Sequence, residues 1–344
     1  MRILLIPLSI IYLIYLNIKN FLFISGILKS TQFNIPVICI GNLSFGGSGK
    51  TPHTDFIVNF LKKKYKVAIL SRGYKRKSSG FIEVNINDSF RRVGDEPLLL
   101  KRKHTNSLVI VCENRKFAIT KIIQEHKDID VIILDDGLQH RKIQAGLNIL
   151  LTPYHNLYFN DYLFPIGTLR DRKSESKRAD NIIITKSPNL ISLLKKKEIT
   201  KKAMFHKEDE CFFSEIKYEK CIHLFNSSKQ KIPEEVLLVT GIADTHSLIE
   251  YLVSSNTRFT HITFKDHHDY NEKDIRKIIQ HFEINQTTKR LILTTEKDAV
   301  KLLEFKSLLK DLPIYYLPIN IKFQEEVKFK KLISEYVRKN KRNS

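Results

Sequence analysis

Short apolar runs alternate with longer amphipathic segments along most of this 344-residue chain. The runs consist mainly of Ile, Leu and Val and end in a glycine or a polar residue, which is typical of strands buried on both faces. The segments between them have the length and the apolar periodicity of helices. Because strands of this kind assemble into a parallel sheet with helices on both faces, the sequence predicts an α/β fold.

The alternation occurs in two sets, which predicts two domains; about 150 residues per domain gives the same number. In the first set we expect strands at 36–41, 66–71, 108–112, 130–135, 147–151 and 181–185, and helices at 51–64, 95–103 and 115–126. In the second set we expect strands at 236–240, 259–264, 291–294 and 314–317, and helices at 244–253, 271–282 and 297–305.

The chain between the two sets, 195–231, is polar and basic, with one weak strand pattern at 211–218. This composition favours a linker. We therefore expect an apolar N-terminal helix (1–30), a larger α/β domain (31–194), the linker, and a smaller α/β domain (232–344) that completes an active-site cleft.

A glycine-rich segment at 41–51, GNLSFGGSGKT, separates the first expected strand from the first expected helix. Its closely spaced glycines let backbone N–H groups converge on phosphate oxygens. The lysine can reach the β- and γ-phosphates, and the threonine hydroxyl suits Mg²⁺. The strict pattern has glycine at position 44, so the alternative is a turn that only resembles a phosphate loop. The residues that we expect to contact ATP are Ser44, Phe45, Gly46, Gly47, Ser48, Gly49, Lys50 and Thr51.

A phosphate loop needs a metal-holding carboxylate at the end of a neighbouring strand. Asp135 and Asp136 follow the apolar run 131–134, and the sequence leaves open which of them would touch Mg²⁺. The alternative role of two acids at a strand end is to cap a turn or helix. Gln139 and His140 follow closely enough to reach the same cleft, although such a histidine is more often an ordinary surface residue.

Two further clusters contain groups that can move a proton. Asp95 and Glu96 lie at a loop-to-helix junction, where acids commonly act as caps. His267 and His268 follow an expected strand, where a polar turn is the ordinary interpretation. An alcohol acceptor in phosphoryl transfer gains from a positioned base, which Asp95 and a histidine of the second domain would supply. Spacing alone favours the ordinary roles over this pairing.

The N-terminus has an uncharged apolar run at 3–16. As a helix this run would be about 21 Å long, short of a hydrocarbon core of about 30 Å. No small-residue cleavage site follows it. Three interpretations remain: a helix in one leaflet, a buried core helix, and a true membrane anchor. Lys19 and Lys29, together with Tyr12 and Tyr15, suit the headgroup zone and favour the first.

Lys and Arg total 58 against 37 Asp and Glu, a formal net charge of +21. This balance favours anionic partners such as phosphates, nucleic acid or an acidic membrane surface. The basic runs 75–77, 101–103 and 195–197 are dispersed, whereas a nucleic-acid binder would have a dense basic stripe with interleaved aromatic residues. We therefore expect no nucleic-acid partner. The four cysteines lack the paired spacing of a zinc site and indicate a reducing compartment.

Six motifs follow one another along the chain: GNLSFGGSGKTP (41–52), SRGYKR (71–76), VGDEP (93–97), DDGLQH (135–140), PIGTLRD (165–171) and TTEKDAVK (294–301). Together they resemble the tetraacyldisaccharide 4'-kinases, the lipid A 4'-kinases, over nearly the whole chain. The resemblance implies a P-loop NTPase-like sheet and transfer of the ATP γ-phosphate to the 4'-hydroxyl of tetraacyldisaccharide 1-phosphate, which gives lipid IVA. It also implies a peripheral or monotopic enzyme on the cytoplasmic face of the inner membrane.

The resemblance also implies a role for individual residues. The family's catalytic Asp–His dyad maps to Asp95 and His267. With the acceptor on one domain and ATP on the other, we expect hinge closure through the linker 195–231. Asp171 stands where family members often carry Glu. The remaining implied roles are catalysis for Lys50, Mg²⁺ binding for Thr51, Asp135 and Asp136, and phosphate or substrate contacts for Arg72, Gln139, His140 and Arg170. The alternative function is a membrane-associated P-loop ATPase switch without a lipid acceptor, but such switches often begin their loop with lysine where this chain has Phe45.

Overall fold

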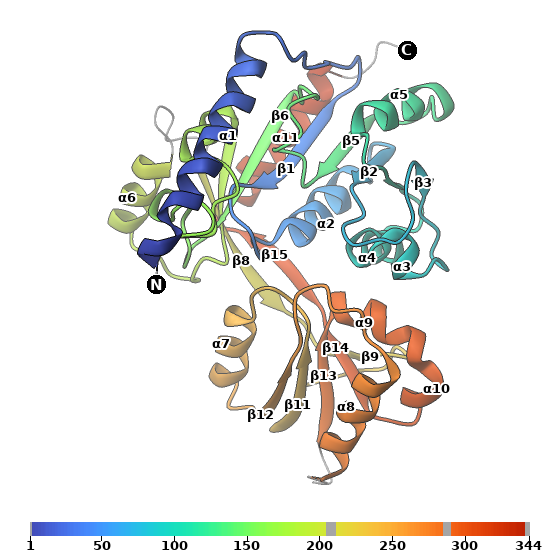
Figure 1. Cartoon of the computed structure of the whole chain (residues 1–344). Helices are drawn as coiled ribbons and strands as arrows, with labels where there is room; N and C mark the ends of the chain where they lie inside the picture. Colours follow the sequence, from blue (N-terminus) through green and yellow to red (C-terminus); the bar gives the residue numbers. More distant parts are fainter. Residues whose placement is uncertain (1, 204–210, 285–289, 341–344) are drawn as a thin grey trace.

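The computed structural model describes residues 2–203, 211–284 and 290–340. These residues form two lobes, each built on its own sheet: a nine-stranded sheet in the larger lobe and a six-stranded sheet in the smaller one (Figure 1). The mixed α/β architecture predicted from the alternation of apolar runs and helices is confirmed.

The larger sheet has the strand order β15-β8-β7-β6-β1-β5-β2-β4-β3. Its central strands are parallel and buried, as uninterrupted apolar runs predict. The strands that run from β1 to β7 are β1 (Val37–Asn42), β2 (Val67–Ser71), β3 (Ile82–Glu83), β4 (Leu108–Val111), β5 (Val131–Asp135), β6 (Leu147–Pro153) and β7 (Asn181–Thr185). The parallel strands place the ends of β1 and β5 side by side, which is where the phosphate loop and the two aspartates follow.

Helices cover both faces of this sheet. On one face, α2, α4 and α11 enclose a core that includes Ile57, Leu98 and Phe329. On the other face, α5 contributes Ile119 and Ile122 to a second core. The helices of this lobe are α2 (Lys50–Leu61), α3 (Phe90–Val93), α4 (Asp95–Lys103), α5 (Arg115–Glu125), α6 (Leu193–Ala203) and α11 (Glu326–Asn340).

The smaller sheet has the order β10-β9-β14-β13-β11-β12, and its four longest strands are parallel. Its strands are β9 (Cys221–His223), β10 (Lys229–Gln230), β11 (Glu235–Thr240), β12 (Arg258–Thr263), β13 (Leu291–Thr295) and β14 (Ile314–Leu317). Its helices are α7 (His246–Ser254), α8 (Glu272–Ile284), α9 (Glu296–Leu302) and α10 (Lys306–Leu309).

The structure divides the chain differently from the expected segments. The region 195–231 is not a linker, because it contains β8 (Cys211–Tyr218), which belongs to the larger sheet, and β9 and β10 of the smaller sheet. The C-terminal part of the expected smaller domain returns to the larger lobe as β15 (Ile319–Phe323) and α11. The expectation of a linker rested on polar composition, but β8 lies between β7 and β15 and buries Phe212, Phe213 and Ser214.

The chain therefore crosses between the lobes twice, from β8 to β9 and from β14 to β15. Figure 1 shows β8 and β15 side by side at the junction of the lobes. The backbone N–H of Glu219 donates to the carbonyl of Pro318 at 3.1 Å and ties the two crossings together.

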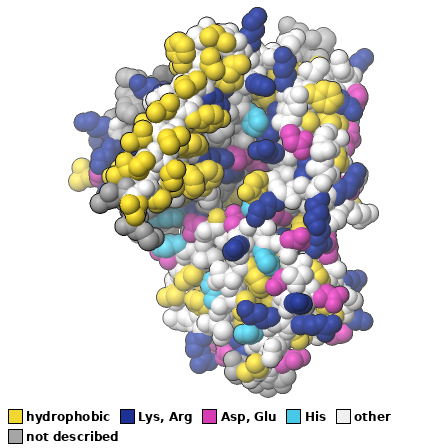
Figure 2. Space-filling model, in the orientation of Figure 1, with side chains coloured by type: hydrophobic (Ala, Val, Ile, Leu, Met, Phe, Trp, Pro, Cys, Tyr) yellow, Lys and Arg dark blue, Asp and Glu magenta, His cyan; other side chains and the backbone are white. Residues whose placement is uncertain are grey.

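An exposed apolar helix, α1 (Ile6–Ile24), lies along the larger lobe. Figure 2 shows its apolar side chains as a continuous yellow band, and only 17% of its apolar window is buried. This exposure excludes the buried core helix that the sequence left open. Three polar side chains on the inner face of α1 bond to the lobe: Ser9 to the carbonyls of Leu163 and Phe164, Tyr12 to that of Arg170, and Asn20 to Glu175.

Candidate active site

The phosphate loop lies between β1 and α2, as the sequence predicts. Gly46 and Gly49 have φ of 101° and 83°, which residues with a Cβ rarely adopt. Because no side chain caps α2, its first N–H groups remain available to an anion. The hydroxyl of Ser48 is buried without a hydrogen-bond partner among the described residues. The loop is therefore shaped to receive an anion and has an unmet polar group within it.

The two strand-end aspartates have different surroundings. Asp136 Oδ2 lies 3.7 Å from Lys50 Nζ, and the carboxylate also pairs with Arg170. Burial disfavours the charged form of Asp136, but Lys50 and Arg170 outweigh burial and hold its pKa well below its usual range. Asp135 is fully buried and accepts a hydrogen bond from Thr54 at 3.0 Å.

Burial, Glu96 and Asp136 together raise the pKa of Asp135 to about 7. Three carboxyl groups thus influence one another beside the phosphate loop. Carboxylate and hydroxyl oxygens are the protein ligands that Mg²⁺ prefers, and a divalent cation would relieve this repulsion. Asp135, Asp136 and the Thr51 hydroxyl at the start of α2 therefore fit a magnesium ion bound to a triphosphate.

The amide and cationic residues predicted for phosphate contacts border this loop. Gln139 Nε2 donates to the carbonyl of Asn42 at 2.8 Å, and Lys50 Nζ donates to the Asn42 side chain at 3.3 Å. Arg170 bonds to the same asparagine. Asn42 was not predicted as a site residue, because the phosphate-loop pattern does not specify the residue at that position.

Two arginines lie close enough to His140 to affect its pKa. Burial, then Arg115 and Arg72, lower the pKa of His140 to about 4. Arg115, the first residue of α5, is only 4% exposed, and burial beside Arg72 lowers its pKa to about 10. Arg115 carried no motif signal in the sequence; only its position after the β4 strand end could have pointed to it.

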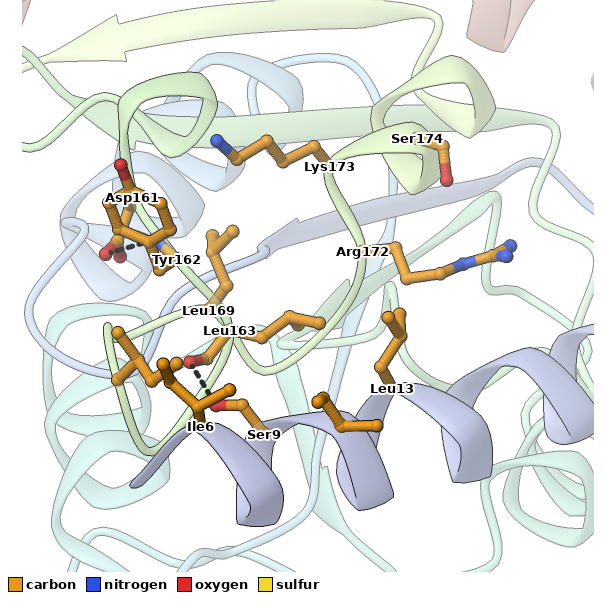
Figure 3. A pocket seen from close by; sticks show the side chains of 12 residues that line it. Ile6, Ser9, Leu13, Asp161, Tyr162, Leu163, Leu169, Arg172, Lys173 and Ser174 are labelled. Atoms are coloured by element: carbon orange, nitrogen blue, oxygen red, sulfur yellow. Dashed lines mark hydrogen bonds between the residues drawn. The ribbon is translucent and has the colours of Figure 1, made fainter. Parts of the chain in front are cut away.

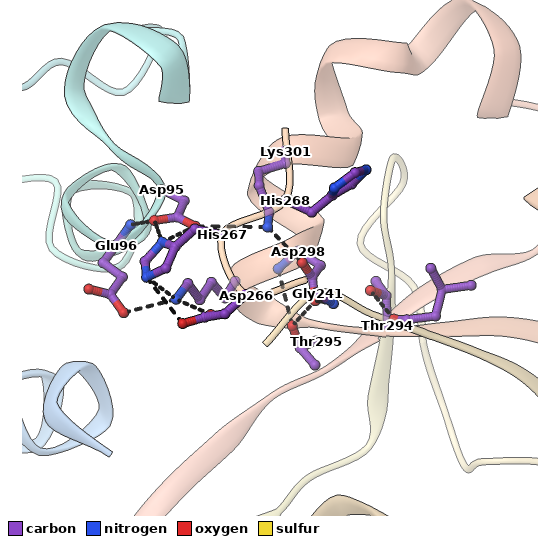
Figure 4. Close-up of polar contacts among 12 residues, drawn as sticks. Asp95, Glu96, Gly241, Asp266, His267, His268, Thr294, Thr295, Asp298 and Lys301 are labelled. Carbon is purple, nitrogen blue, oxygen red and sulfur yellow. Dashed lines mark hydrogen bonds and ion pairs between the residues drawn. The ribbon is translucent and has the colours of Figure 1, made fainter. Parts of the chain in front are cut away.

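Asp95 and His267 meet at the junction of the lobes, although 172 positions separate them. His267 Nδ1 lies 3.0 Å from each carboxylate oxygen of Asp95 (Figure 4). Asp95 begins α4 and is 5% exposed, while His267 sits in a left-handed turn after β12 with φ of 54°. The ring of Tyr74 packs against His267 with centroids 5.0 Å apart. His268 faces away from this pair and bonds to Asp274 at 2.8 Å.

Two lysines of α9 stabilise this pair and were not singled out from the sequence. Lys297 Nζ lies 3.0 Å from His267 Nε2, and Lys301 Nζ lies 3.8 Å from Asp95. Burial disfavours the charge on Asp95, but Lys297 and the hydrogen bond from His267 outweigh it and lower the Asp95 pKa. The signal for these lysines was the TTEKDAVK motif, which carried the resemblance without a role.

The paired residues open onto a cavity of about 390 Å³ between the lobes. Its lining carries both charges: lysines and arginines such as Lys75, Arg91 and Lys265 outnumber the three aspartates. Glu96, which follows Asp95, pairs with Lys297 at 3.1 Å, and its charge contributes to the raised pKa of Asp135 beside the phosphate loop. The arrangement can hold an anionic acceptor beside a basic group and a triphosphate.

A second cavity, of about 420 Å³, lies between α1 and the segment 161–174. Figure 3 shows Ile6 and Leu13 on the α1 side of this cavity, and Leu163 and Arg172 on the side of the segment 161–174. Its lining is almost entirely apolar, and its cationic groups come from Arg172 and Lys173. This combination suits an amphiphile with apolar chains and a negative head.

Comparisons with known proteins agree with these features. The family model described as tetraacyldisaccharide-1-P 4'-kinase matches residues 1–338. A tetraacyldisaccharide 4'-kinase of Flavobacterium psychrophilum is 42% identical over 97% of this chain and 96% of its own, and one of Phocaeicola vulgatus is 40% identical over 98% and 96%. A crystal structure of the Aquifex aeolicus protein of this family in complex with ATP superposes with a TM-score of 0.74 at 29% identity, covering 98% of this chain and 99% of that one.

Proposed function

The chain belongs to the tetraacyldisaccharide-1-P 4'-kinase family, and from this premise we propose that it transfers the γ-phosphate of ATP to the 4'-hydroxyl of tetraacyldisaccharide 1-phosphate. The product is lipid IVA, an intermediate of lipid A biosynthesis. The observation that carries the assignment is the Asp95–His267 pair, which joins the two lobes and is linked through Glu96 to the acids of the phosphate loop.

The phosphate loop and its cations would stabilise the charge that develops during transfer. Lys50 and the N-terminus of α2 hold the β- and γ-phosphates, and Arg170 restrains Asp136. Asp135 or Asp136, together with Thr51, would hold Mg²⁺, which would supply positive charge to stabilise the phosphate group during transfer. Arg72 and Arg115 add positive charge on the side of His140.

Asp95 would act as the base for the acceptor. The 4'-oxygen attacks the γ-phosphorus, the bond from that phosphorus to the β,γ-bridging oxygen breaks, and ADP leaves with the electron pair. The hydroxyl proton passes to the Asp95 carboxylate, while His267 Nδ1–H holds that carboxylate in place. The cavity beside the pair, where cationic side chains outnumber the aspartates, would receive the anionic disaccharide head.

The helix α1 would bind the enzyme to the cytoplasmic face of the inner membrane from one leaflet. Its inner face is bonded along its length to the larger lobe, from Ser9 to Asn20, so the helix lies on the protein instead of projecting from it. Its outer face presents aliphatic and aromatic side chains, including Ile11, Ile14 and Phe21. This geometry matches an interfacial helix better than a membrane-spanning one.

A direct assay tests the function. Purified protein is incubated with ATP, Mg²⁺ and the disaccharide 1-phosphate lipid, and the lipid is weighed by mass spectrometry for one added phosphate. Lys50→Ala should lower turnover at least ~10²-fold, because the cation that stabilises the charge on the transferred phosphoryl group is lost, while exposed Lys63→Ala should keep wild-type activity. ATP hydrolysis with no phosphate on the lipid would favour the ATPase switch instead.

A further inference from the structure

Lys297 makes three polar contacts at the point where the lobes meet. Its Nζ lies 3.0 Å from His267 Nε2, 3.1 Å from Glu96 Oε1 and 3.3 Å from Asp266 Oδ1. Burial disfavours its charge, but Glu96, Asp95 and Asp266 outweigh burial and raise the pKa of Lys297. Lys297 is therefore an ammonium group with each of its three protons near an acceptor.

An ammonium group can only donate hydrogen bonds, so the contact with His267 Nε2 requires that nitrogen to carry a lone pair. The proton of a neutral imidazole must then sit on Nδ1, which faces both oxygens of Asp95. The two neighbours of the ring thus demand the same tautomer. With Nε2 occupied, the ring is an orienting group for Asp95.

The position of Lys297 is fixed by its helix. Thr295 caps α9 by accepting from the N–H of Asp298, and Asp298 accepts from the N–H of Gly241 at 2.8 Å. Glu296 pairs with Lys103 of α4 at 3.2 Å, so α9 is also attached to the helix that begins with Asp95. Lys297 comes from the smaller lobe and Glu96 from the larger one, so the full set of contacts forms only when the lobes are together.

We propose that Lys297 is a positioning residue that holds His267 in the Nδ1–H tautomer, with that proton directed at Asp95, when the two lobes meet. The proposal rests on the proposed function for its kinetic consequences but not for the tautomer itself. It gives the TTEKDAVK motif a role. Lys297 orients His267, while Thr295 before it and Asp298 after it hold the start of the helix in place.

The charged groups around His267 come from every packed element. Asp95 and Glu96 face it from α4, Lys297 and, through Asp95, Lys301 face it from α9, and Asp266 precedes it in its own turn. From the loop after β2, Lys75 bonds to the carbonyl of Asp266 and Tyr74 supplies a ring. Among these, Lys297 lies nearest to Nε2, at 3.0 Å, within hydrogen-bond distance, whereas Asp266 Oδ2 lies 3.6 Å from the same nitrogen.

Three substitutions separate the hydrogen bond from the charge. Lys297→Met removes both and should lower kcat ~10²-fold, the scale of a small misplacement of a reacting group, with the KM for ATP within a few-fold of wild type. Lys297→Gln keeps a donor for Nε2 without the charge and should recover part of kcat. Lys297→Arg keeps both and should recover more. Exposed Lys306→Met is the matched control and should behave as wild type.

The pH profile supplies a readout that a merely structural role would not move. Because Lys297 lowers the pKa of Asp95, its loss should raise that pKa and move the acid limb of kcat to higher pH. The shift should appear in Lys297→Met and Lys297→Gln and be absent in Lys297→Arg. An acid limb unchanged in Lys297→Met, with wild-type kcat, would overturn the proposal.

The tautomer is measured without turnover. In protein labelled with ¹⁵N-histidine, the His267 signals are assigned by their loss in His267→Asn. Wild-type protein should show a protonated Nδ1 and an unprotonated Nε2, and Lys297→Met should add a protonated Nε2. An identical His267 spectrum in folded Lys297→Met would refute the positioning role even if the enzyme is a kinase, whereas a wild-type protein that fails to phosphorylate the lipid would refute the function alone.

Discussion

At the scale of single residues, the first prediction concerns Asp95, the proposed base. Asp95→Asn keeps the size of the side chain but removes its proton-accepting charge, so turnover should fall ~10²–10⁴-fold. The affinity for ATP should stay close to wild type, because Asp95 lies at the junction of the lobes and not in the phosphate loop. Steady-state kinetics with lipid and ATP varied separately measure both quantities. An equal loss of ATP affinity and rate would make Asp95 a cap of α4 with no part in the chemistry.

The raised pKa of Asp135 predicts how the free energy of unfolding depends on pH. Its pKa in the folded protein is about 7, against an ordinary value of 3.8. The unfolded chain loses this proton at lower pH than the folded one, so the group stabilises the fold at acidic pH. That contribution is lost as pH rises from about 4 through 7, at no more than about 1.4 kcal/mol per pH unit.

Asp135→Asn should remove this dependence, since Asn can still accept from Thr54 without titrating. Urea unfolding at pH 5 and pH 8, with EDTA and without nucleotide, gives the free energies of unfolding. In wild type, the free energy of unfolding should be lower at pH 8 than at pH 5 because of Asp135. In the variant, this loss of stability at pH 8 should be smaller. Parallel pH profiles for the two proteins would contradict the assignment of the raised pKa to Asp135.

The residues also show what sequence reasoning can and cannot reach. Lys50 and Asp136 were predictable because a phosphate loop and a strand-end acid lie at fixed places along neighbouring parallel strands. Asp95 and His267 were not, since 172 positions separate them and each has an ordinary local role; only the family resemblance paired them. Lys297 acts through a histidine from another segment, and no local pattern records such a contact.

At the scale of elements, the proposed role of α1 is to bind the protein to a membrane surface. Ile11 and Ile14 are more than half exposed on its outer face. Replacing both with Asp should weaken partitioning onto phosphatidylethanolamine–phosphatidylglycerol vesicles ~10²-fold or more, because each buried aliphatic side chain contributes about 1.5–3 kcal/mol. Vesicle sedimentation measures this partitioning.

Val327→Asp is the matched control for that experiment. Val327 is 83% exposed, but it lies on α11 on another part of the larger lobe. It should leave vesicle binding unchanged. If the α1 double variant sedimented with vesicles as well as Val327→Asp, basic patches and not the helix would hold the protein at the membrane.

Elements were predicted well where burial dictates the pattern and poorly where it does not. The apolar strands β1, β5 and β7 are buried on both faces, so their composition leaves little alternative. The strand β8 contains charged residues as well as the buried Phe212 and Phe213. Because a linker also contains many polar residues, composition alone did not distinguish the two. The return of β15 to the larger sheet depends on long-range pairing, which no local periodicity encodes.

At the scale of the whole molecule, the lobes are joined by two adjacent crossings of the chain and are in contact on both sides of the phosphate loop. One contact set is the α4–α9 junction around Lys297. The other joins Asp244 of the smaller lobe to Lys186 at 2.5 Å and to His155 at 3.1 Å. A Cβ added at Gly47 would lie 3.2 Å from that of Asp244, so the smaller lobe touches the phosphate loop itself.

The Asp244–Lys186 pair should therefore couple lobe closure to the nucleotide site. Asp244→Ala leaves the mostly buried Lys186 without its carboxylate and should cost about 1–3 kcal/mol of stability. The double variant Lys186→Met/Asp244→Ala should recover part of that loss, since no charge is left unpaired. Small-angle X-ray scattering should find Asp244→Ala more open on average than wild type, and a non-hydrolysable ATP analogue with Mg²⁺ should narrow the difference. The pair would have no role in closure if two results were found together. The effects of Lys186→Met and Asp244→Ala on the free energy of unfolding would add within about 0.5 kcal/mol, and the scattering curves would be identical. The two crossings and the α4–α9 junction would then set the closure.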